Sequence, residues 1–329
     1  MSEKLSEVWE CYDMTIVSMF KGRGMNYLRT DKGIRILQPL VTSESRLEQE
    51  AALKEQLMQA GYTRVDCFVR NKAGELVTYD RYHTPYVLKE YFDGKECNIH
   101  SEEDMHLAID NLAELHLALR QIGREDIYEQ DSSKIPKTFL RHNREMQRVR
   151  AYMRKKATKS EFDYLYLSCF DTFYQQGELI VDSLKAYQQK MEHQSLYYCH
   201  GAYNQHNILL CKEGAATVNF DHFMVDNQLI DVYTFLRKAM EKNEYQSGML
   251  FRLIETYEKK VPLSNQDYHF LYYLLWYPEK FWKITNQYNN MNKAWIPPKT
   301  YEKLETIIRQ EALKQELLQQ YRNHYRIET

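Results

Sequence analysis

Hydrophobic and polar positions follow two different periods along this chain. Up to about residue 100, short runs rich in β-branched and aromatic residues are separated by turn sequences such as Thr30-Asp31-Lys32-Gly33. Such runs predict β-strands. We expect them over 15–20, 26–30, 34–40, 67–71, 75–80 and 86–92, with 67–71 and 75–80 forming a hairpin. One helix interrupts the strands, with Ser43 or Ser45 as its cap and Gly61 at its end.

Beyond residue 100 the apolar positions recur at helical spacing. Ser101 with Asp104 resembles a capping box, and helices are predicted over 137–157, over 160–194 and from 231 to the end. A small β insertion interrupts them, with strands over 196–199, 208–211 and 217–220. The order predicts an α+β chain of two lobes, with a β-rich lobe over 1–92 and a mainly helical lobe over 93–329 that contains the hairpin at 196–221.

Composition and charge narrow the class of protein. The 329 residues are 43% hydrophobic and 27% charged, with a net charge of -2, so nothing in the overall charge favours nucleic acid or an anionic membrane as a partner. The N-terminus does not resemble a signal peptide, and the longest apolar stretch, 271–277, is too short to span a bilayer. We therefore expect synthesis in the cytoplasm, with six reduced cysteines that form no C-x-x-C pair.

Candidate chemistry is concentrated between residues 200 and 221. The sequence reads His200-Gly201-Ala202-Tyr203-Asn204-Gln205-His206-Asn207 and continues, after a strand and a turn, to Val218-Asn219-Phe220-Asp221. Phosphoryl transfer needs a carboxylate at the acceptor hydroxyl, an Asn and an Asp that hold magnesium, and a Lys that a helical Glu fixes against the phosphates. The loop followed by a hairpin has the spacing of the first three groups.

This motif resembles the H-G-D-x-x-x-x-N loop of the aminoglycoside-phosphotransferase-like kinases, and most of the chain looks like the CotS-type spore coat proteins. The closer resemblance rests on four segments that occur in order: 86–97 (YVLKEYFDGKEC), 111–116 (NLAELH), 231–238 (DVYTFLRK) and 278–305, which starts PEKFWK. It implies a bilobal protein-kinase-like fold. It also implies a location in the spore coat, with other coat proteins as partners.

The chain departs from the kinase pattern at two positions that the resemblance marks as catalytic. Ala202 occupies the place of the catalytic Asp, and Gln38 occupies the place of the strand Lys, which leaves Glu50, the expected helical Glu, without a cation to fix. The loss of a positioned base alone costs about 10²–10⁴-fold in rate. Asn207 and Asp221 remain as possible ligands of Mg²⁺ and, with Gln38 and Glu50, outline a degenerate ATP site.

Several polar residues near the motif have alternative roles. His200, His206 and His222 lie close in sequence, but their spacing fits no familiar zinc pattern, and we expect them to satisfy backbone groups instead. A role for His206 as a replacement base remains a weaker alternative. Asp231 is expected to cap the helix that follows the motif and to brace the loop.

The sequence thus favours a pseudokinase that serves as a structural or assembly protein of the spore coat. Two alternatives stay open. The chain could be an active small-molecule kinase with a rearranged site, or a nucleotide-binding scaffold without chemistry.

Overall fold

Packing divides the chain into two compact units. The computed structural model describes residues 3–22, 25–122, 133–190, 196–290 and 297–328. The N-terminal unit comprises residues 1–125 and 198–224, and the helical unit comprises 126–197 and 225–329. This division differs from the predicted boundary after residue 92, because the loop and hairpin of the motif pack with the N-terminal residues.

The main sheet of the N-terminal unit has six strands: β1 (Ile16–Gly22), β2 (Met25–Thr30), β3 (Gly33–Pro39), β4 (Phe68–Val69), β5 (Thr78–Tyr79) and β6 (Pro85–Glu90). Their order is β1-β2-β3-β6-β4, and β5 also pairs with β6. The predicted hairpin of 67–71 with 75–80 is therefore wrong in its pairing, because β4 and β5 each pair antiparallel with β6. The long-range partner satisfies their backbone groups in place of the local one.

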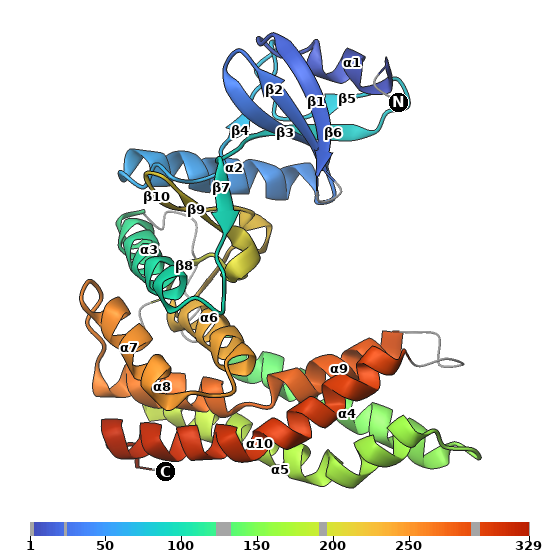
Figure 1. The fold of residues 1–329 in the computed structure, drawn as a ribbon, viewed down its shortest axis with the longest axis vertical. Coiled ribbons are helices and arrows are strands. Elements are labelled where there is room, and N and C mark those ends of the chain that lie inside the picture. Colours follow the sequence, from blue (N-terminus) through green and yellow to red (C-terminus); the bar gives the residue numbers. More distant parts are fainter. Residues whose placement is uncertain (1–2, 23–24, 123–132, 191–195, 291–296, 329) are drawn as a thin grey trace. The chain divides into compact units, whose positions relative to one another are not determined.

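Each face of this sheet is covered by one helix (Figure 1). On one face Leu37 and Leu88 pack with Val8 and Tyr12, next to α1 (Glu3–Trp9). On the opposite face Val87 packs with residues of α2 (Glu44–Gln59). Successive residues of a strand alternate between faces, so Val87 and Lys89 of β6 both face α2, and Leu88 does not.

Helix α2 begins and ends where local chemistry predicts. The Ser43 hydroxyl accepts a hydrogen bond from the Arg46 backbone N–H at 3.3 Å, which satisfies one free donor of the first turn. Gly61 follows the helix with φ of +87°, a left-handed conformation that favours glycine. These two residues fix the span that carries Glu50 and Lys54 toward the sheet.

A second, three-stranded sheet in the order β10-β9-β7 carries the motif. Its strands are β7 (Gly94–Glu96), β9 (Ile208–Cys211) and β10 (Gly214–Thr217), and α3 (Glu102–Gln121) packs against β9 and β10. The predicted strand over 217–220 is wrong, because β10 ends at Thr217 and residues 220–222 form a turn of 3₁₀-helix. The buried Asn111 amide of α3 donates hydrogen bonds to the hydroxyls of Thr217 and Tyr203 and fixes the hairpin to the helix.

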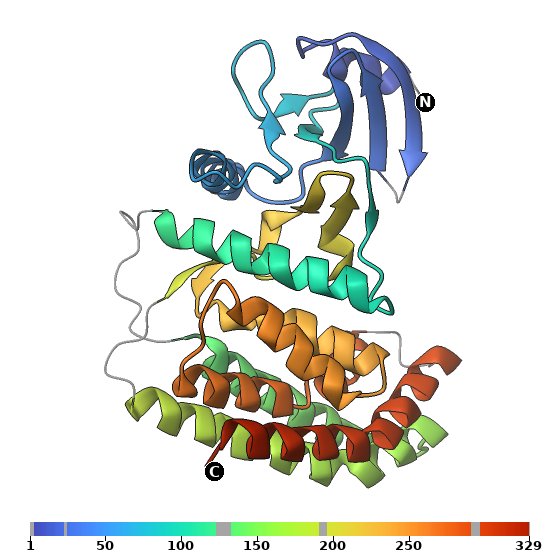
Figure 2. The same ribbon diagram turned by 60° about the vertical axis from the view of Figure 1, so that its left-hand side comes forward.

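The helical unit contains seven α-helices in its described residues: α4 (Ile135–Lys155), α5 (Glu161–Lys190), α6 (Leu229–Lys242), α7 (Ser247–Glu258), α8 (Asn265–Trp276), α9 (Glu279–Asn290) and α10 (Pro298–Tyr325). An aromatic core that includes Phe170 and Phe281 joins α4, α5, α9 and α10. Helices α5 (yellow-green) and α10 (red) lie side by side in two views (Figures 1 and 2).

The described chain also has two short strands, β8 (Tyr197–Cys199) and β11 (Met224–Asp226), and a turn of 3₁₀-helix over 205–207. The expectation that Asp231 caps its helix is wrong. Helix α6 starts at Leu229 with Gln228 as its N-cap, so Asp231 lies inside the first turn, where it is fully buried. A carboxylate in a first turn is still favoured by the positive end of the helix dipole.

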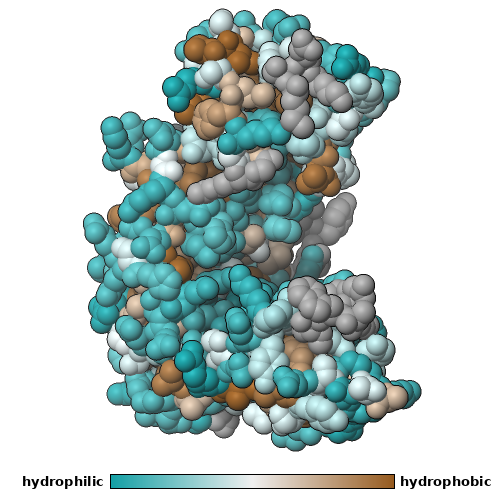
Figure 3. Space-filling view, turned by 45° about the vertical axis from the view of Figure 1, so that its right-hand side comes forward, coloured by the Kyte–Doolittle hydropathy of each residue, from teal (hydrophilic) through white to brown (hydrophobic). Residues whose placement is uncertain are grey.

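On the face shown in Figure 3, hydrophilic residues cover most of the surface and hydrophobic residues form small separate groups. None of the helices that the structure describes is both long and apolar enough to cross a membrane.

Candidate functional site

The largest feature of the motif region is a pocket of about 570 Å³ that lies wholly within the N-terminal unit. Its wall combines residues from β3, α2, β6 and the motif loop, and every site residue predicted from the sequence is among them: Gln38, Glu50, Ala202, Asn207 and Asp221. The volume lies within the range of small-molecule sites, about 300–1,000 Å³. Folding thus gathers these five residues around one cavity.

The backbone of the motif loop is held in a conformation that requires glycine. Gly201 has φ of +77°, and a side chain there would overlap the carbonyl oxygen of His222. His200 is fully buried, and its Nδ1 accepts the Ala202 backbone N–H at 3.2 Å. Its other ring nitrogen lies 3.0 Å from the Val218 carbonyl oxygen and so carries the proton. The imidazole therefore ties the loop to the end of the hairpin.

At residue 202, where the resemblance to kinases leads us to expect a catalytic Asp, the loop offers a methyl group and a backbone carbonyl. The Ala202 carbonyl oxygen accepts hydrogen bonds from the amides of Asn204 at 2.8 Å and Asn207 at 2.9 Å. Neither the methyl group nor this carbonyl can take a proton from an acceptor hydroxyl at neutral pH. Residue 202 therefore brings no carboxylate to the pocket.

The side chain beside Asn207 is that of Asn219. The Asn219 amide donates to the Asn207 Oδ1 at 3.0 Å, and the Asn219 backbone adopts φ of 63°, a left-handed conformation that Asn and Asp tolerate. Asn207 in turn donates its own amide to Ala202. The two neutral amides are therefore joined to each other by one hydrogen bond and to Ala202 by another, and the sequence spacing alone did not identify Asn219.

Asp221 lines the pocket but faces other charges. Its Oδ2 lies 3.6 Å from His222 Nε2, and its side chain is half exposed. Arg46 of α2 stacks over the Phe223 ring at 3.5 Å and donates to the Phe223 carbonyl oxygen. Burial lowers the pKa of the Arg46 guanidinium, and the opposing effect of the Glu50 and Asp221 carboxylates does not fully offset it. In the described residues no hydrogen bond joins Asp221 to Asn207.

Asn207 and Asp221 are the residues that would hold the magnesium ion that the fold implies, but the Asn207 Oδ1 already accepts a hydrogen bond from Asn219. Mg²⁺ is usually bound through one or two carboxylates together with phosphate and water oxygens. Here two amides bind each other, and the single carboxylate is half exposed beside His222. Within the described parts of the chain, no group of three or more His, Cys, Asp or Glu residues is arranged to hold a metal ion.

Glu50 does have cations to fix, which corrects the expectation drawn from Gln38. Its Oε1 lies 2.6 Å from Lys54 Nζ and 3.8 Å from Lys89 Nζ. Asp66 completes the cluster, with its carboxylate 2.8 Å from Lys54 Nζ and 3.6 Å from Lys89 Nζ. The error arose because Lys54 lies one helical turn beyond Glu50, and Lys89 lies on the strand next to β3.

The electrostatics of this buried cluster favour its charged form. Burial alone would lower the pKa of Lys54, but Asp66 and Glu50 outweigh it, and the pKa is raised. Burial would likewise raise the pKa of Asp66, but Lys54 and Lys89, with a hydrogen bond from the Asn219 backbone, hold it below the usual range. All four groups are at most 6% exposed at their side chains, so two anions and two cations are buried together.

The remaining two histidines of the motif contact different partners. His206 Nδ1 lies 3.1 Å from the Glu96 carboxylate and its Nε2 lies 3.0 Å from the Gln205 amide, whereas His222 faces Asp221.

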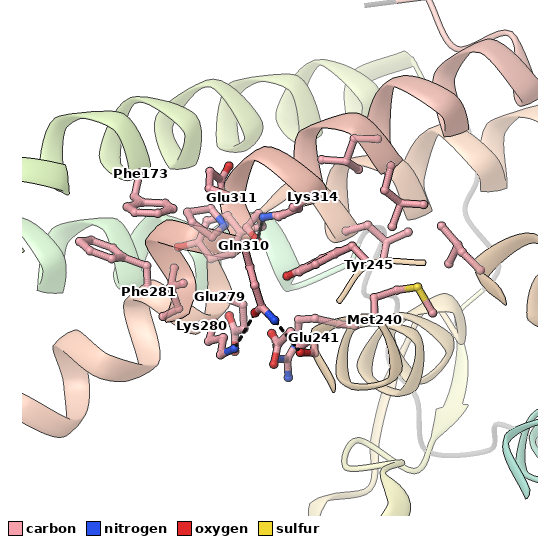
Figure 4. Close-up of a pocket in the computed structure, with 18 residues that line it drawn as sticks. Phe173, Met240, Glu241, Tyr245, Glu279, Lys280, Phe281, Gln310, Glu311 and Lys314 are labelled. Carbon is pink, nitrogen blue, oxygen red and sulfur yellow. Dashed lines mark hydrogen bonds and ion pairs between the residues drawn. The ribbon is translucent and has the colours of Figure 1, made fainter. Parts of the chain in front are cut away.

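A second cavity lies in the helical unit, but it is much smaller. Its volume is about 30 Å³, which suits a few water molecules. Figure 4 shows Gln310 of α10 reaching between Lys280 and the Glu241 backbone, with distances of 3.3 Å to each. Nearby, Arg237 and Glu241 pair at 2.7 Å. Two atoms of its lining residues, Arg237 Nε and Glu279 Oε2, are buried without a hydrogen-bond partner in the described chain, but the volume is too small for a ligand larger than water. The candidate site is therefore the pocket of the N-terminal unit.

Comparison with solved structures shows the fold. An aminoglycoside phosphotransferase from Alicyclobacillus acidocaldarius matches with a TM-score of 0.82 at 16% identity, over 97% of this chain and 95% of that chain. The amicoumacin kinase hAmiN, solved with AMP-PNP, Ca²⁺ and Ami, matches with a TM-score of 0.61 at 12% identity, over 96% and 93%. The AMP-bound spectinomycin phosphotransferase matches with a TM-score of 0.62 at 10% identity, over 92% and 93%.

These likenesses confirm the predicted kinase-like α+β fold, with its β-rich N-terminal region and helical C-terminal region. Among curated proteins, none matches the chain. A family model described as "Spore coat putative kinase YutH" matches residues 6–321, which is nearly the whole sequence and confirms the resemblance to CotS-type proteins. The chain therefore belongs to the YutH family of spore coat proteins, built on a kinase-like fold.

Proposed function

We propose that this protein is a pseudokinase that acts as a structural or assembly component of the spore coat. The observation that carries the proposal is that Ala202, which the resemblance places at the catalytic Asp, lines the pocket with a methyl group. A methyl group can neither orient nor deprotonate an acceptor hydroxyl, and the loss of such a base typically costs about 10²–10⁴-fold in rate. Family membership supports the location in the coat and other coat proteins as partners.

The metal side of the pocket supports the same proposal. Phosphoryl transfer depends mainly on positioning and on stabilising the charge that develops on the phosphoryl oxygens. The amides of Asn207 and Asn219 carry no charge, and they are engaged with each other. A site with one half-exposed carboxylate is expected to hold magnesium weakly, which adds to the cost of losing the base.

The direct test is ATP turnover with magnesium on a panel of small hydroxyl and amine acceptors. We expect no turnover above the level of the Asp221→Ala variant. Ala202→Asp tests the base position, with Ala202→Asn as a control of similar size that lacks a charge. A large gain in Ala202→Asp alone would show that the native site is impaired. Robust native turnover that Asp221→Ala abolishes would refute the proposal.

The coat role is tested separately in sporulating cells. A fluorescent fusion of the wild-type protein is expected to become incorporated into the coat, and the Asp221→Ala fusion should do so equally. Loss of incorporation in a variant that folds normally, as judged by its melting temperature, would show that the coat role needs the pocket chemistry.

A second candidate function is a nucleotide-binding scaffold, which the pocket of about 570 Å³ favours. Solved relatives with this fold were crystallised with AMP-PNP or AMP. A ligand that binds the folded state raises the melting temperature by mass action. Millimolar ATP with magnesium should therefore raise it, and the absence of any shift would count against both the scaffold and an active kinase.

A further inference from the structure

The buried charge cluster at the pocket holds its two lysines very differently. Lys54 Nζ lies within 3.0 Å of three oxygens: the Glu50 carboxylate at 2.6 Å, the Asp66 carboxylate at 2.8 Å and the Asp66 carbonyl at 3.0 Å. An ammonium group has three N–H donors. Lys54 therefore binds α2 to the segment that carries Asp66, through two close ion pairs and one hydrogen bond.

Lys89 Nζ has no comparable set of partners. Its carboxylate neighbours, Asp66 and Glu50, lie at 3.6 and 3.8 Å, and the Phe68 ring centroid lies at 4.9 Å. Across the described ranges of the chain, no acceptor lies within hydrogen-bonding distance of this ammonium group, although its side chain is 6% exposed. Lys89 lines the pocket and Lys54 does not. Within the described residues, the Lys89 ammonium therefore has no close protein acceptor and borders the cavity, which favours an acceptor that enters there.

The sheet register explains how this lysine reaches the place where a strand lysine was expected. Strands β3 and β6 are antiparallel neighbours, with Gln38 opposite Val87 and Ile36 opposite Lys89. Gln38, Val87 and Lys89 all line the pocket. The positive charge that β3 lacks at Gln38 is thus supplied by the adjacent strand and lies beside the same helical residue, Glu50.

We propose that Lys89 is the anion-binding residue of this pocket and takes the phosphate group of a small-molecule ligand in place of the missing strand lysine. The inference rests on the proposal that the pocket binds nucleotide. Phosphate oxygens would supply the acceptors that Lys89 lacks, while Lys54 keeps Glu50 and Asp66 in place. The opposing interpretation is that Lys89 only balances the buried carboxylates.

The test measures binding of ATP and of tripolyphosphate to the full chain in EDTA, by melting temperature and by calorimetry. Lys89→Met should weaken both ligands at least about tenfold, as expected for the loss of one charged hydrogen bond, and Lys89→Arg should restore most of the affinity. The matched control is Lys95→Met, because the Lys95 side chain is 69% exposed and lies in the same unit. This control should bind as the wild type does.

The outcomes distinguish failure of the nucleotide pocket from failure of the role of Lys89 alone. If the wild type binds neither ligand, both the nucleotide pocket and the role of Lys89 are refuted. If the wild type binds and Lys89→Met binds equally well, only the role of Lys89 is refuted, and the lysine is a structural counter-ion.

A second measurement needs no variant, in case Lys89→Met fails to fold. An acyl phosphate of ATP transfers its acyl group to a nearby lysine amine, which forms an amide and releases the nucleotide. We expect peptide mass spectrometry of the wild-type protein to find the acyl group on Lys89, and excess ATP to suppress it. Labelling that occurs only on other lysines would overturn the proposal.

Discussion

Asp66→Asn is expected to be the most informative change to the stability of the N-terminal unit. The substitution keeps the size of the side chain and removes one of the two buried anions that face Lys54 and Lys89. It leaves two buried cations with Glu50 as their one remaining carboxylate. It also weakens the tie to the hairpin, because Asp66 accepts the Asn219 backbone N–H at 3.1 Å.

The magnitude follows from burial. Removing one partner of a buried ion pair costs about 3–5 kcal/mol, since an uncompensated charge stays in the interior. Glu50 still lies 2.6 Å from Lys54, so we expect the lower end of this range, about 3 kcal/mol. The matched control is Asp13→Asn. Asp13 pairs with Lys32 at 3.0 Å in the same unit, but both side chains are more than half exposed, and such pairs contribute about 0–1 kcal/mol.

The assay is guanidinium unfolding followed by hydrogen exchange in peptides from α2 and β6. Peptide resolution is needed because a chain of two compact units need not unfold in one step. A loss below about 1 kcal/mol, or one equal to that of Asp13→Asn, would refute the buried-charge argument. The effect should also depend on pH. The folded pKa of Asp66 lies below its unfolded value of about 3.9, so its stabilisation is present above that pH and is lost as the pH falls through the folded pKa.

Three further outcomes are expected. Gly201→Ala should destabilise the motif loop by several kcal/mol, because the added methyl group would overlap the His222 carbonyl oxygen. Gly74→Ala is the control, since Gly74 has a similar φ but open space around it, and it should cost only about 1 kcal/mol. Equal losses of the two variants in a melting assay would contradict the clash. Asn219→Asp should raise the affinity for magnesium, measured by calorimetry, because it places a carboxylate next to Asn207. An unchanged affinity would show that residues 207 and 219 are not arranged to bind a metal ion. Burial, with Arg141 and Lys283 nearby, lowers the pKa of His142 to about 3, so stability should fall by about 2 kcal/mol between pH 7 and pH 5 as the unfolded state takes up the proton. His142→Gln should remove that dependence in urea titrations, and an unchanged slope would contradict the assignment.

Elements with local start and stop signals were predictable from the sequence. The strands now seen as β1, β2, β3 and β6, and the helices α2 and α4, match the predicted ranges within a few residues. Ser43 and Gly61 show why, because a capping hydroxyl and a left-handed glycine act within one turn of the helix end.

Pairings and charge partners were less predictable, because they depend on residues far apart in the sequence. The segment 67–80 looked like a closed hairpin, yet its short strands pair with β6. Asp66, which lies in no helix or strand, joins Lys54 and Lys89 only through the tertiary fold. Likewise, spacing along the chain favoured Asp221 as the partner of Asn207, whereas the left-handed turn at Asn219 brings that residue there.

The register between β3 and β6 has a consequence for comparing members of this family. Gln38 and Lys89 reach the same cavity from adjacent strands. A basic side chain can therefore enter this cavity from β6 as well as from β3. A comparison that inspects only the β3 position would classify this chain as lacking a basic residue. Relatives with an uncharged residue in β3 are therefore best sorted by whether β6 carries a lysine or arginine on the face toward α2.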